Sequence, residues 1–281
     1  MPTGPLTTPD GQAIKAHWQA KAAHWTDWAD GMAAMAARFN QPLLDAIKLS
    51  SGERVLDLAS GAGEPALSAA ARVAPDGLVV ASDLIADMVR GVKSRAGTDP
   101  LYGVAADMQA LPFADGAFDK LTCRFGIMFV PDPLCAAQQA ARVLRSGGRA
   151  GFLVWGPRAD QTIFTVLGDA VAEVLGLAMD DHHFQIFRFG NPGSLSHILE
   201  AAGLRHVQEE ALHFTPTAPA DKPFWRPQLD MSFGHLLDGI SDADSKALDA
   251  RIREKLAPLR SKDGRGYRLK AHIRLVTGRA P

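Results

Sequence analysis

The most informative stretch of this sequence is Val55-Leu56-Asp57-Leu58-Ala59-Ser60-Gly61-Ala62-Gly63-Glu64-Pro65. Residues 54–58 are mostly apolar and predict a short buried strand, and the glycines that follow predict a tight turn. Pro65 suits the first turn of a helix, because its missing N–H would have no partner there. The stretch therefore predicts a strand, a glycine loop and a helix. In open α/β sheets, such a loop lies at the ligand-binding edge.

Strand and helix patterns alternate on the C-terminal side of this stretch. Strands are expected over residues 54–58, 78–82, 102–106, 120–125 and 150–155, and helices over 66–73, 85–92 and 134–144. Strands that alternate with helices predict a mostly parallel sheet that is covered on both faces. The expected fold class is therefore α/β, with a Rossmann-like core over residues 50–156.

The rest of the chain adds further segments to this core. Residues 1–49 predict an N-terminal helical cap, broken at Asn40-Gln41-Pro42, where Pro42 is expected to start a second short helix. Residues 157–190 predict a helical lid insertion. Residues 191–281 are expected to complete the sheet, with a helix after 191–193, strands over 207–214 and 267–277, and an irregular insertion at 216–266.

Composition favours a globular protein and excludes several function classes. Hydrophobic residues make up 47% and charged residues 22% of the chain, and 30 basic residues nearly balance 31 acidic ones. No basic footprint for nucleic acid is visible. Two cysteines do not build a disulfide framework, and no Cys/His spacing suggests a metal site. Without a signal peptide or a long apolar run, a cytoplasmic protein with no membrane span is expected.

Three aspartates follow or end successive predicted strands, and they distinguish two possible cofactors. Gly61 to Ala66 fits the dinucleotide pattern G-x-G-x-x-A, and Asp83 lies 22 positions after Gly61, so a nicotinamide oxidoreductase is an alternative. However, Asp57 would repel a pyrophosphate, whereas it would attract the ammonium and sulfonium of S-adenosylmethionine. Asp107 can accept a hydrogen bond from an adenine amino group. Each aspartate alone could be a cap or turn residue, but three beside a glycine loop favour S-adenosylmethionine.

Together these motifs resemble the class I methyltransferases of the ubiquinone/menaquinone-biosynthesis type (methyltransferase type 11). The likeness covers residues 50–156 and is carried by the segments 55–63, 82–84, 106–113, 118–119, 125–129 and 142–149. The resemblance implies a seven-stranded sheet with an antiparallel last strand. This sequence departs from the family pattern at Ala59, where glycine is usual, at Ser60, where cysteine is common, and at Ser146, where proline is usual.

The resemblance also implies roles for individual residues. Asp57 would lie near the methionine end of the cofactor, Asp83 would hold the ribose hydroxyls, and Asp107 with Met108 would lie at the adenine. Arg124 and Phe125 would lie near the transferred methyl. The full set of expected cofactor-binding residues is Asp57, Ser60, Gly61, Ala62, Gly63, Asp83, Leu84, Asp107, Met108, Arg124 and Phe125.

Candidate residues for catalysis and for acceptor binding lie outside the glycine loop. Methyl transfer from a sulfonium needs a base only if the acceptor must lose a proton. The candidate catalytic residues are His182, His183 and Arg124, with His17 and His24 as further candidate bases. Aromatic residues of the added segments suggest an apolar or planar acceptor. The candidate acceptor-binding residues are Trp25, Trp28, Phe125, Trp155 and Phe187.

The function predicted from the sequence is S-adenosylmethionine-dependent methylation of a small molecule. Oxygen or carbon acceptors are favoured over nitrogen, because Cys123-Arg124-Phe125-Gly126 stands where an Asn/Asp-Pro-Pro-Tyr/Phe motif would indicate amino methylation of bases. Two alternatives stay open at this point. One is an NAD(P)-dependent oxidoreductase, and the other is a non-catalytic binding module with the methyltransferase fold.

Overall fold

A computed structural model describes residues 16, 18–19, 38–97, 99–178 and 185–281. The chain divides into two compact units, and each unit combines segments that are distant in the sequence. Unit 1 is formed by Met1–Val154, Pro192–Glu210 and Arg274–Pro281, and unit 2 by Trp155–Asn191 and Ala211–Ile273.

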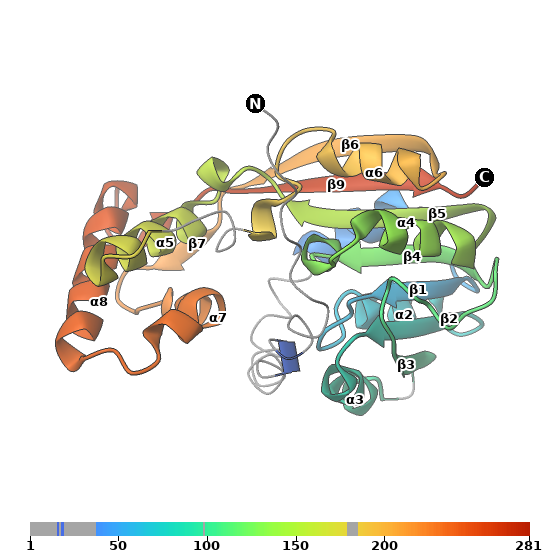
Figure 1. Ribbon diagram of the computed structural model, residues 1–281, viewed down its shortest axis with the longest axis horizontal. Helices are drawn as coiled ribbons and strands as arrows, with labels where there is room; N and C mark the ends of the chain where they lie inside the picture. The colour runs from blue at the N-terminus through green and yellow to red at the C-terminus, as the bar shows by residue number, and fades with distance from the viewer. Residues whose placement is uncertain (1–15, 17, 20–37, 98, 179–184) are drawn as a thin grey trace. The chain divides into compact units, whose positions relative to one another are not determined.

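The central sheet has seven strands in the order β3-β2-β1-β4-β5-β9-β6 (Figure 1). The strands are β1 (Arg54–Leu58), β2 (Leu78–Asp83), β3 (Leu101–Ala105), β4 (Phe118–Arg124), β5 (Leu144–Trp155), β6 (Arg205–Phe214) and β9 (Ala271–Arg279). β1 to β5 pair in parallel. β9 runs antiparallel to β5, as two backbone hydrogen bonds show. Gly147, near the start of β5, donates its N–H to the carbonyl of Ala280 just after β9, and Gly156, just after β5, donates its N–H to the carbonyl of His272 near the start of β9. The predicted mostly parallel sheet with an antiparallel last strand is confirmed.

Helices of unit 1 pack closely on this sheet because small residues line the contacts. They are α2 (Ala66–Val73), α3 (Ala86–Arg95), α4 (Pro133–Val143), α6 (Ser194–Ala201) and the short 3₁₀ helix η1 (Ile127–Phe129). α2 buries Ala66, Ala69, Ala70 and Val73, whose spacing places them on one helical face. A Cβ added to Gly103 of β3 would lie 2.4 Å from a Val89 methyl of α3. Glycine at this position therefore allows α3 to approach the sheet.

The helix that precedes β1 differs from the sequence prediction. Residues 38–46 are helical without interruption, so the break expected at Asn40-Gln41-Pro42 is wrong. Leu43, Leu44 and Ile47 are buried. Leu43 and Ile47 pack closely against Gly151 of β5, since a Cβ added to Gly151 would lie only 2.6 Å from Ile47. Burial of this apolar face stabilises the helix despite the hydrogen bond that a proline cannot donate.

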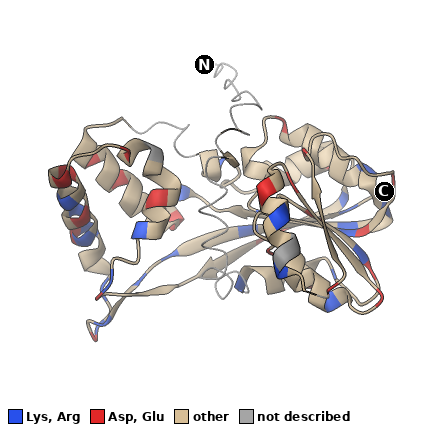
Figure 2. Ribbon diagram, turned by 90° about the horizontal axis from the view of Figure 1, so that it is seen from below, with Lys and Arg blue, Asp and Glu red and all other residues tan. Residues whose placement is uncertain are grey.

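Unit 2 is a helical unit with a small two-stranded sheet. Its elements are α5 (Thr162–Leu175), α7 (Arg226–Leu237), α8 (Asp242–Leu256), β7 (Thr217–Pro219), β8 (Gly266–Arg268), η2 (Arg158–Asp160), η3 (Gln185–Phe187) and η4 (Ala257–Leu259). The helices enclose Trp225, which is fully buried. The segment 216–266, expected to be irregular, thus contains two regular helices. α8, the leftmost helix in Figure 2, carries side chains of both signs, and its Arg251 and Lys255 pair with Glu173 of α5.

The last strand predicted over 267–277 is divided in the structure into β8 and β9. Leu269 donates its backbone N–H to the Pro216 carbonyl, and Lys270 donates to the Thr162 hydroxyl. These local partners take the two N–H groups that a continuous strand would use in its ladder, so the strand ends and restarts. None of the described helices is long and apolar enough to cross a membrane.

Candidate functional site

The glycine loop joins β1 to α2 and adopts backbone angles that favour glycine. Gly61 and Gly63 have φ of +51° and +112°, and Ala59 has φ of +50° although it carries a Cβ. A Cβ added to Gly61 would meet no atom within 4 Å, so the space beside this residue is open. The carbonyl of Ala62 accepts a hydrogen bond from the Arg95 guanidinium. The loop is therefore held from one side and leaves room for a ligand at Gly61.

Asp57 and Ser60 carry the buried polar atoms of this loop. The Thr122 hydroxyl donates to Asp57 Oδ1 at 2.7 Å, but Oδ2 of Asp57 and the hydroxyl of Ser60 are buried without a hydrogen-bond partner among the described residues. Burial raises the pKa of Asp57 to about 7, against the lowering effects of Thr122 and Arg124. Buried polar atoms are rarely left unpaired in native proteins. Two of them here indicate a place where a ligand completes the hydrogen bonding.

Asp83 ends β2 and holds the glycine loop in position. Its Oδ2 accepts from the Gly61 N–H at 2.8 Å and its Oδ1 from the Ile85 N–H at 2.9 Å. Burial raises the pKa of Asp83, against the effect of these backbone donors. Each carboxylate oxygen can accept a second hydrogen bond, so both keep capacity for a ligand hydroxyl. Leu84, the next residue, packs on the buried pair Ile85 and Met88.

Asp107 follows β3 and is oriented by a residue that the sequence analysis did not single out. Gln109 donates its backbone N–H to Asp107 Oδ1 at 2.8 Å, and its side-chain amide lies 3.2 Å from both carboxylate oxygens. The Gln109 side-chain oxygen in turn accepts from the Asp132 N–H at 3.0 Å. Met108 lies between them with only 9% of its surface exposed. Gln109 thus fixes the carboxylate that was predicted to lie at the adenine.

The end of β4 contacts the glycine loop directly. Arg124 Nε donates to the Glu64 carbonyl at 3.2 Å, and burial lowers the pKa of Arg124. Phe125 has φ of +60°, and its ring meets the Phe39 ring edge-on at 5.9 Å. A Cβ added to Gly126 would lie 2.3 Å from the Cβ of Ala59. Gly126 is a site residue that the sequence analysis missed, because only the contact with Ala59 shows why glycine is required.

Asn40 and Glu64 form a second contact that sequence reasoning missed. Asn40, which is 2% exposed, donates to Glu64 Oε2 and to the Ser68 hydroxyl, and Ser68 donates to the same Glu64 oxygen. The sequence pattern indicates for Asn40 only a break between helices. The structure instead places its amide against the residue that follows the last loop glycine.

Other predicted site residues lie in unit 2 or outside the described residues. Trp155 and Phe187 both meet Phe164 edge-on, with ring centroids 5.2 Å and 5.5 Å apart. Trp25, Trp28, His182, His183, His17 and His24 lie outside the described residues. Burial raises the pKa of Cys123 to about 12, which fits a buried strand cysteine and not a nucleophile.

Unit 2 also contains a buried histidine that the sequence analysis did not consider. Nδ1 of His272 lies 2.9 Å from Asp160 Oδ2, while its Nε2 is buried with no hydrogen-bond partner among the described residues. The His213 ring lies 4.1 Å from the His272 ring. The only sequence signal is a histidine within the apolar last strand, which does not predict these contacts.

Comparisons of sequence support the interpretation of the core. Residues 56–152 match the methyltransferase domain family Methyltransf_11. The chain is 43% identical over 107 residues to a demethylmenaquinone methyltransferase of Beutenbergia cavernae, covering 38% of this chain and 42% of that protein. It is 38% identical over 141 residues to an uncharacterised protein of Mycobacterium tuberculosis, covering 48% of this chain and 50% of that protein. The chain thus spans about half the length of the curated relatives it matches.

Solved structures share the fold at low sequence identity. Phosphoethanolamine N-methyltransferase 2 of Haemonchus contortus, in complex with phosphomonomethylethanolamine and S-adenosylhomocysteine, has a TM-score of 0.53 and 16% identity. That match covers 87% of this chain and 52% of that one. The [4+2]-cyclase SpnF has a TM-score of 0.52 and 19% identity, with coverage of 87% and 80%. Residues 56–152 thus match a methyltransferase domain family, and these solved structures share the fold of the chain.

Proposed function

We propose that this chain binds S-adenosylmethionine at the glycine loop and transfers its methyl group to a small, largely apolar or planar molecule. The observation that carries the proposal is that Oδ2 of Asp57 and the hydroxyl of Ser60, three residues further on, are buried with no hydrogen-bond partner among the described residues. A buried carboxylate oxygen without a partner is costly, and a ligand ammonium would supply both the hydrogen bond and the counter-charge. A nicotinamide dinucleotide carries no such group at its pyrophosphate.

The remaining cofactor residues fit the same ligand. Asp83 and Asp107 are already oriented by backbone N–H donors and keep lone pairs that ribose hydroxyls and an adenine amine can use. Gly61 donates its N–H to Asp83, and the open space beside Gly61 gives a nucleoside the close access to the backbone that it would need.

The cofactor supplies an activated methyl group on a sulfonium, which departs as a neutral thioether. The protein must then bind, orient and exclude water, and alignment of the reactants can contribute about 7–11 kcal/mol to lowering the barrier. We infer oxygen or carbon as the acceptor atom, since the segment Cys123-Arg124-Phe125-Gly126 after β4 offers no motif for an amino group.

The acceptor class is inferred from the aromatic residues of unit 2. Trp155, Phe164 and Phe187 form an edge-to-face cluster, and Trp155 and Phe187 keep partly exposed surfaces. Aromatic surfaces bind apolar and planar ligands well. An acceptor can be sought by mass spectrometry in a panel of phenols and isoprenoids incubated with labelled cofactor. Trp155→Ala should then raise KM for that acceptor and leave the affinity for S-adenosylhomocysteine unchanged.

Calorimetry with S-adenosylhomocysteine and, separately, with NADH tests the cofactor. We expect S-adenosylhomocysteine to bind and NADH not to bind. Ser60→Ala should weaken S-adenosylhomocysteine binding about fivefold or more, as expected for a lost hydrogen bond of roughly 1 kcal/mol. Ser50→Ala, at an exposed serine before β1, is the matched control and should bind as the native protein does. Binding of NADH alone would show that the proposal is wrong.

A further inference from the structure

Three arginines gather on neighbouring strands at the edge of the unit 1 sheet opposite the glycine loop. Arg149 lies on β5 opposite the start of β4, Arg279 ends the antiparallel β9, and Arg205 starts β6. A hollow of about 220 Å³ opens there. It is lined by Ser146, Gly147, Arg205, His206, Arg279, Ala280 and Pro281, and is called the basic hollow below.

These three arginines lack the counter-charges that their neighbours have. Elsewhere on the same sheet edge, Arg54 and Arg145 share the carboxylate of Asp119, at 3.3 Å and 2.6 Å. No ion pair joins Arg149, Arg205 or Arg279 to a carboxylate in the part of the chain that the structure describes. Burial and the positive charge of Arg279 together lower the pKa of Arg149. The cluster is therefore self-repelling, and a bound anion would relieve the repulsion.

We propose that the basic hollow binds a compact phosphate-bearing anion. The planar fork of an arginine donates two parallel hydrogen bonds to phosphate oxygens, and Arg205 and Arg279 both line the hollow. Ser146 adds a hydroxyl at the position where the related family usually has proline. The small volume suits a single phosphate or pyrophosphate group. An extended nucleic-acid strand is not favoured, because the 30 basic residues of the chain are balanced by 31 acidic ones.

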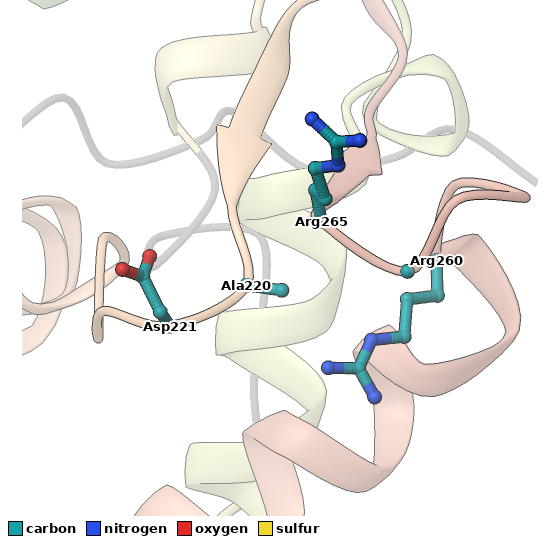
Figure 3. A pocket seen from close by; sticks show the side chains of 5 residues that line it. Ala220, Asp221, Arg260 and Arg265 are labelled. Atoms are coloured by element: carbon teal, nitrogen blue, oxygen red, sulfur yellow. The ribbon is translucent and has the colours of Figure 1, made fainter.

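A second arginine-lined hollow, in unit 2, provides a matched comparison. It has a volume of about 390 Å³ and is lined by Ala220, Asp221, Arg260, Gly264 and Arg265. Figure 3 shows that the two guanidinium groups extend in different directions and that Asp221 lies on the facing segment. Arg265 is also 3.7 Å from Asp263. Here Asp263 already offsets Arg265, and the two guanidinium groups do not converge, so no anion is expected to bind tightly.

Calorimetry with inorganic pyrophosphate at low ionic strength tests the proposal on the full chain. We expect the native protein and the Arg260→Gln/Arg265→Gln control to bind equally, and Arg205→Gln/Arg279→Gln to bind at least tenfold more weakly. AMP titrated in parallel distinguishes a nucleotide from a free inorganic anion, both of which fit the proposal. Equal binding by all three proteins, no binding by the native protein, or binding of single-stranded RNA without pyrophosphate would each overturn it.

Thermal melting separates anion binding from a structural role. Without anion, Arg279→Gln should melt at a higher temperature than the native protein, because it removes the repulsion between Arg279 and Arg149. A lower melting temperature would show that Arg279 stabilises the fold, and would contradict the proposal. S-adenosylhomocysteine affinity should be the same in all these variants, so failure at the basic hollow is distinguishable from failure of the proposed methyltransferase function.

Discussion

Asp57 destabilises the folded protein at neutral pH, because its carboxylate is fully buried and its Oδ2 has no hydrogen-bond partner among the described residues. Its pKa rises from the ordinary 3.8 to about 7. Between these two values the folded protein keeps a proton that the unfolded chain releases. The contribution of Asp57 to stability therefore falls as pH rises through this window, by roughly 4 kcal/mol in total.

Asp57→Asn should accordingly raise the stability of the folded protein and weaken ligand binding. At pH 8 we expect a higher melting temperature than in the native protein, since no charge is buried, and a weaker decline in melting temperature between pH 5 and pH 7. Affinity for S-adenosylhomocysteine should fall at least tenfold because the ligand ammonium loses its counter-charge. Asp76→Asn, at an exposed aspartate, controls for general charge effects. A lower melting temperature of Asp57→Asn at pH 8 would refute the electrostatic argument.

The positions of three site residues were predictable from the sequence alone. Asp57, Asp83 and Asp107 lie at or just after the ends of β1, β2 and β3, as the pattern indicates, and their roles toward a ligand stay predictions. Gln109 and Asn40 were missed because their roles depend on hydrogen bonds to residues 2 and 24 positions away. A glutamine in a turn and an asparagine in a helix are too common to indicate such contacts.

Two loops of unit 1 lie very close together at Ala59 and Gly126. Ala59 belongs to the glycine loop and Gly126 to the turn after β4, and a side chain on Gly126 would overlap Ala59. Ala59 also has φ of +50°, where a Cβ is unfavourable. The close approach of these loops therefore depends on having no more than one methyl group between them.

Gly126→Ala should destabilise the protein by about 1–3 kcal/mol and weaken S-adenosylhomocysteine binding, because the overlap pushes the glycine loop away. Ala59→Gly in the same chain should restore part of both losses, since it removes the overlapping methyl and the unfavourable φ. Restoration is expected to be incomplete, because Cys123 Sγ lies 3.2 Å from the new Cβ. Denaturant unfolding of the native protein, the two single variants and the double variant gives a double-mutant cycle. Gly234→Ala in α7 is the control, because a Cβ added there would have no atom within 4 Å. If the effects of Gly126→Ala and Ala59→Gly on the free energy of unfolding were purely additive, the direct contact between the two positions would be contradicted.

Strands were predicted well where local pattern decides them, and less well where a distant partner does. β1 was predicted to the residue, because an apolar run ends at glycines. β5 was expected to begin at Ala150 but begins at Leu144, since Gly147 and Gly148 form backbone hydrogen bonds with Ala280, just after the antiparallel last strand. A Ser-Gly-Gly sequence indicates a turn, and nothing local reveals a partner strand more than 130 positions away.

At the scale of the whole molecule, the two units have separate cores. Trp225 is fully buried in unit 2, where its Nε1 donates to Asp249 at 3.2 Å and the Arg253 guanidinium lies 4.8 Å from its ring. The contacts described for the glycine loop all lie within unit 1. The structure therefore predicts that unit 2 can be loosened without loss of cofactor binding.

Trp225→Ala should cost unit 2 about 3–5 kcal/mol through the large cavity it leaves. Hydrogen exchange should show lost protection in α5, α7 and α8, with protection of β1 and β4 retained. S-adenosylhomocysteine affinity should stay within twofold of the native value. Trp225→Phe, which keeps an aromatic ring, should retain most of the protection. If loss of protection in unit 2 were accompanied by loss of ligand binding, the separation of the two cores would be wrong.

The interleaving of the two units has a consequence for synthesis on the ribosome. β1 to β5 are complete once residue 155 has been translated, but β9 cannot be added until the segment 211–273 has followed. At roughly 5–20 residues per second, β5 remains an uncovered edge strand for on the order of ten seconds. Its apolar residues then present an unpaired edge on which other chains can add. The nascent chain, and not the finished protein, is the state most exposed to aggregation.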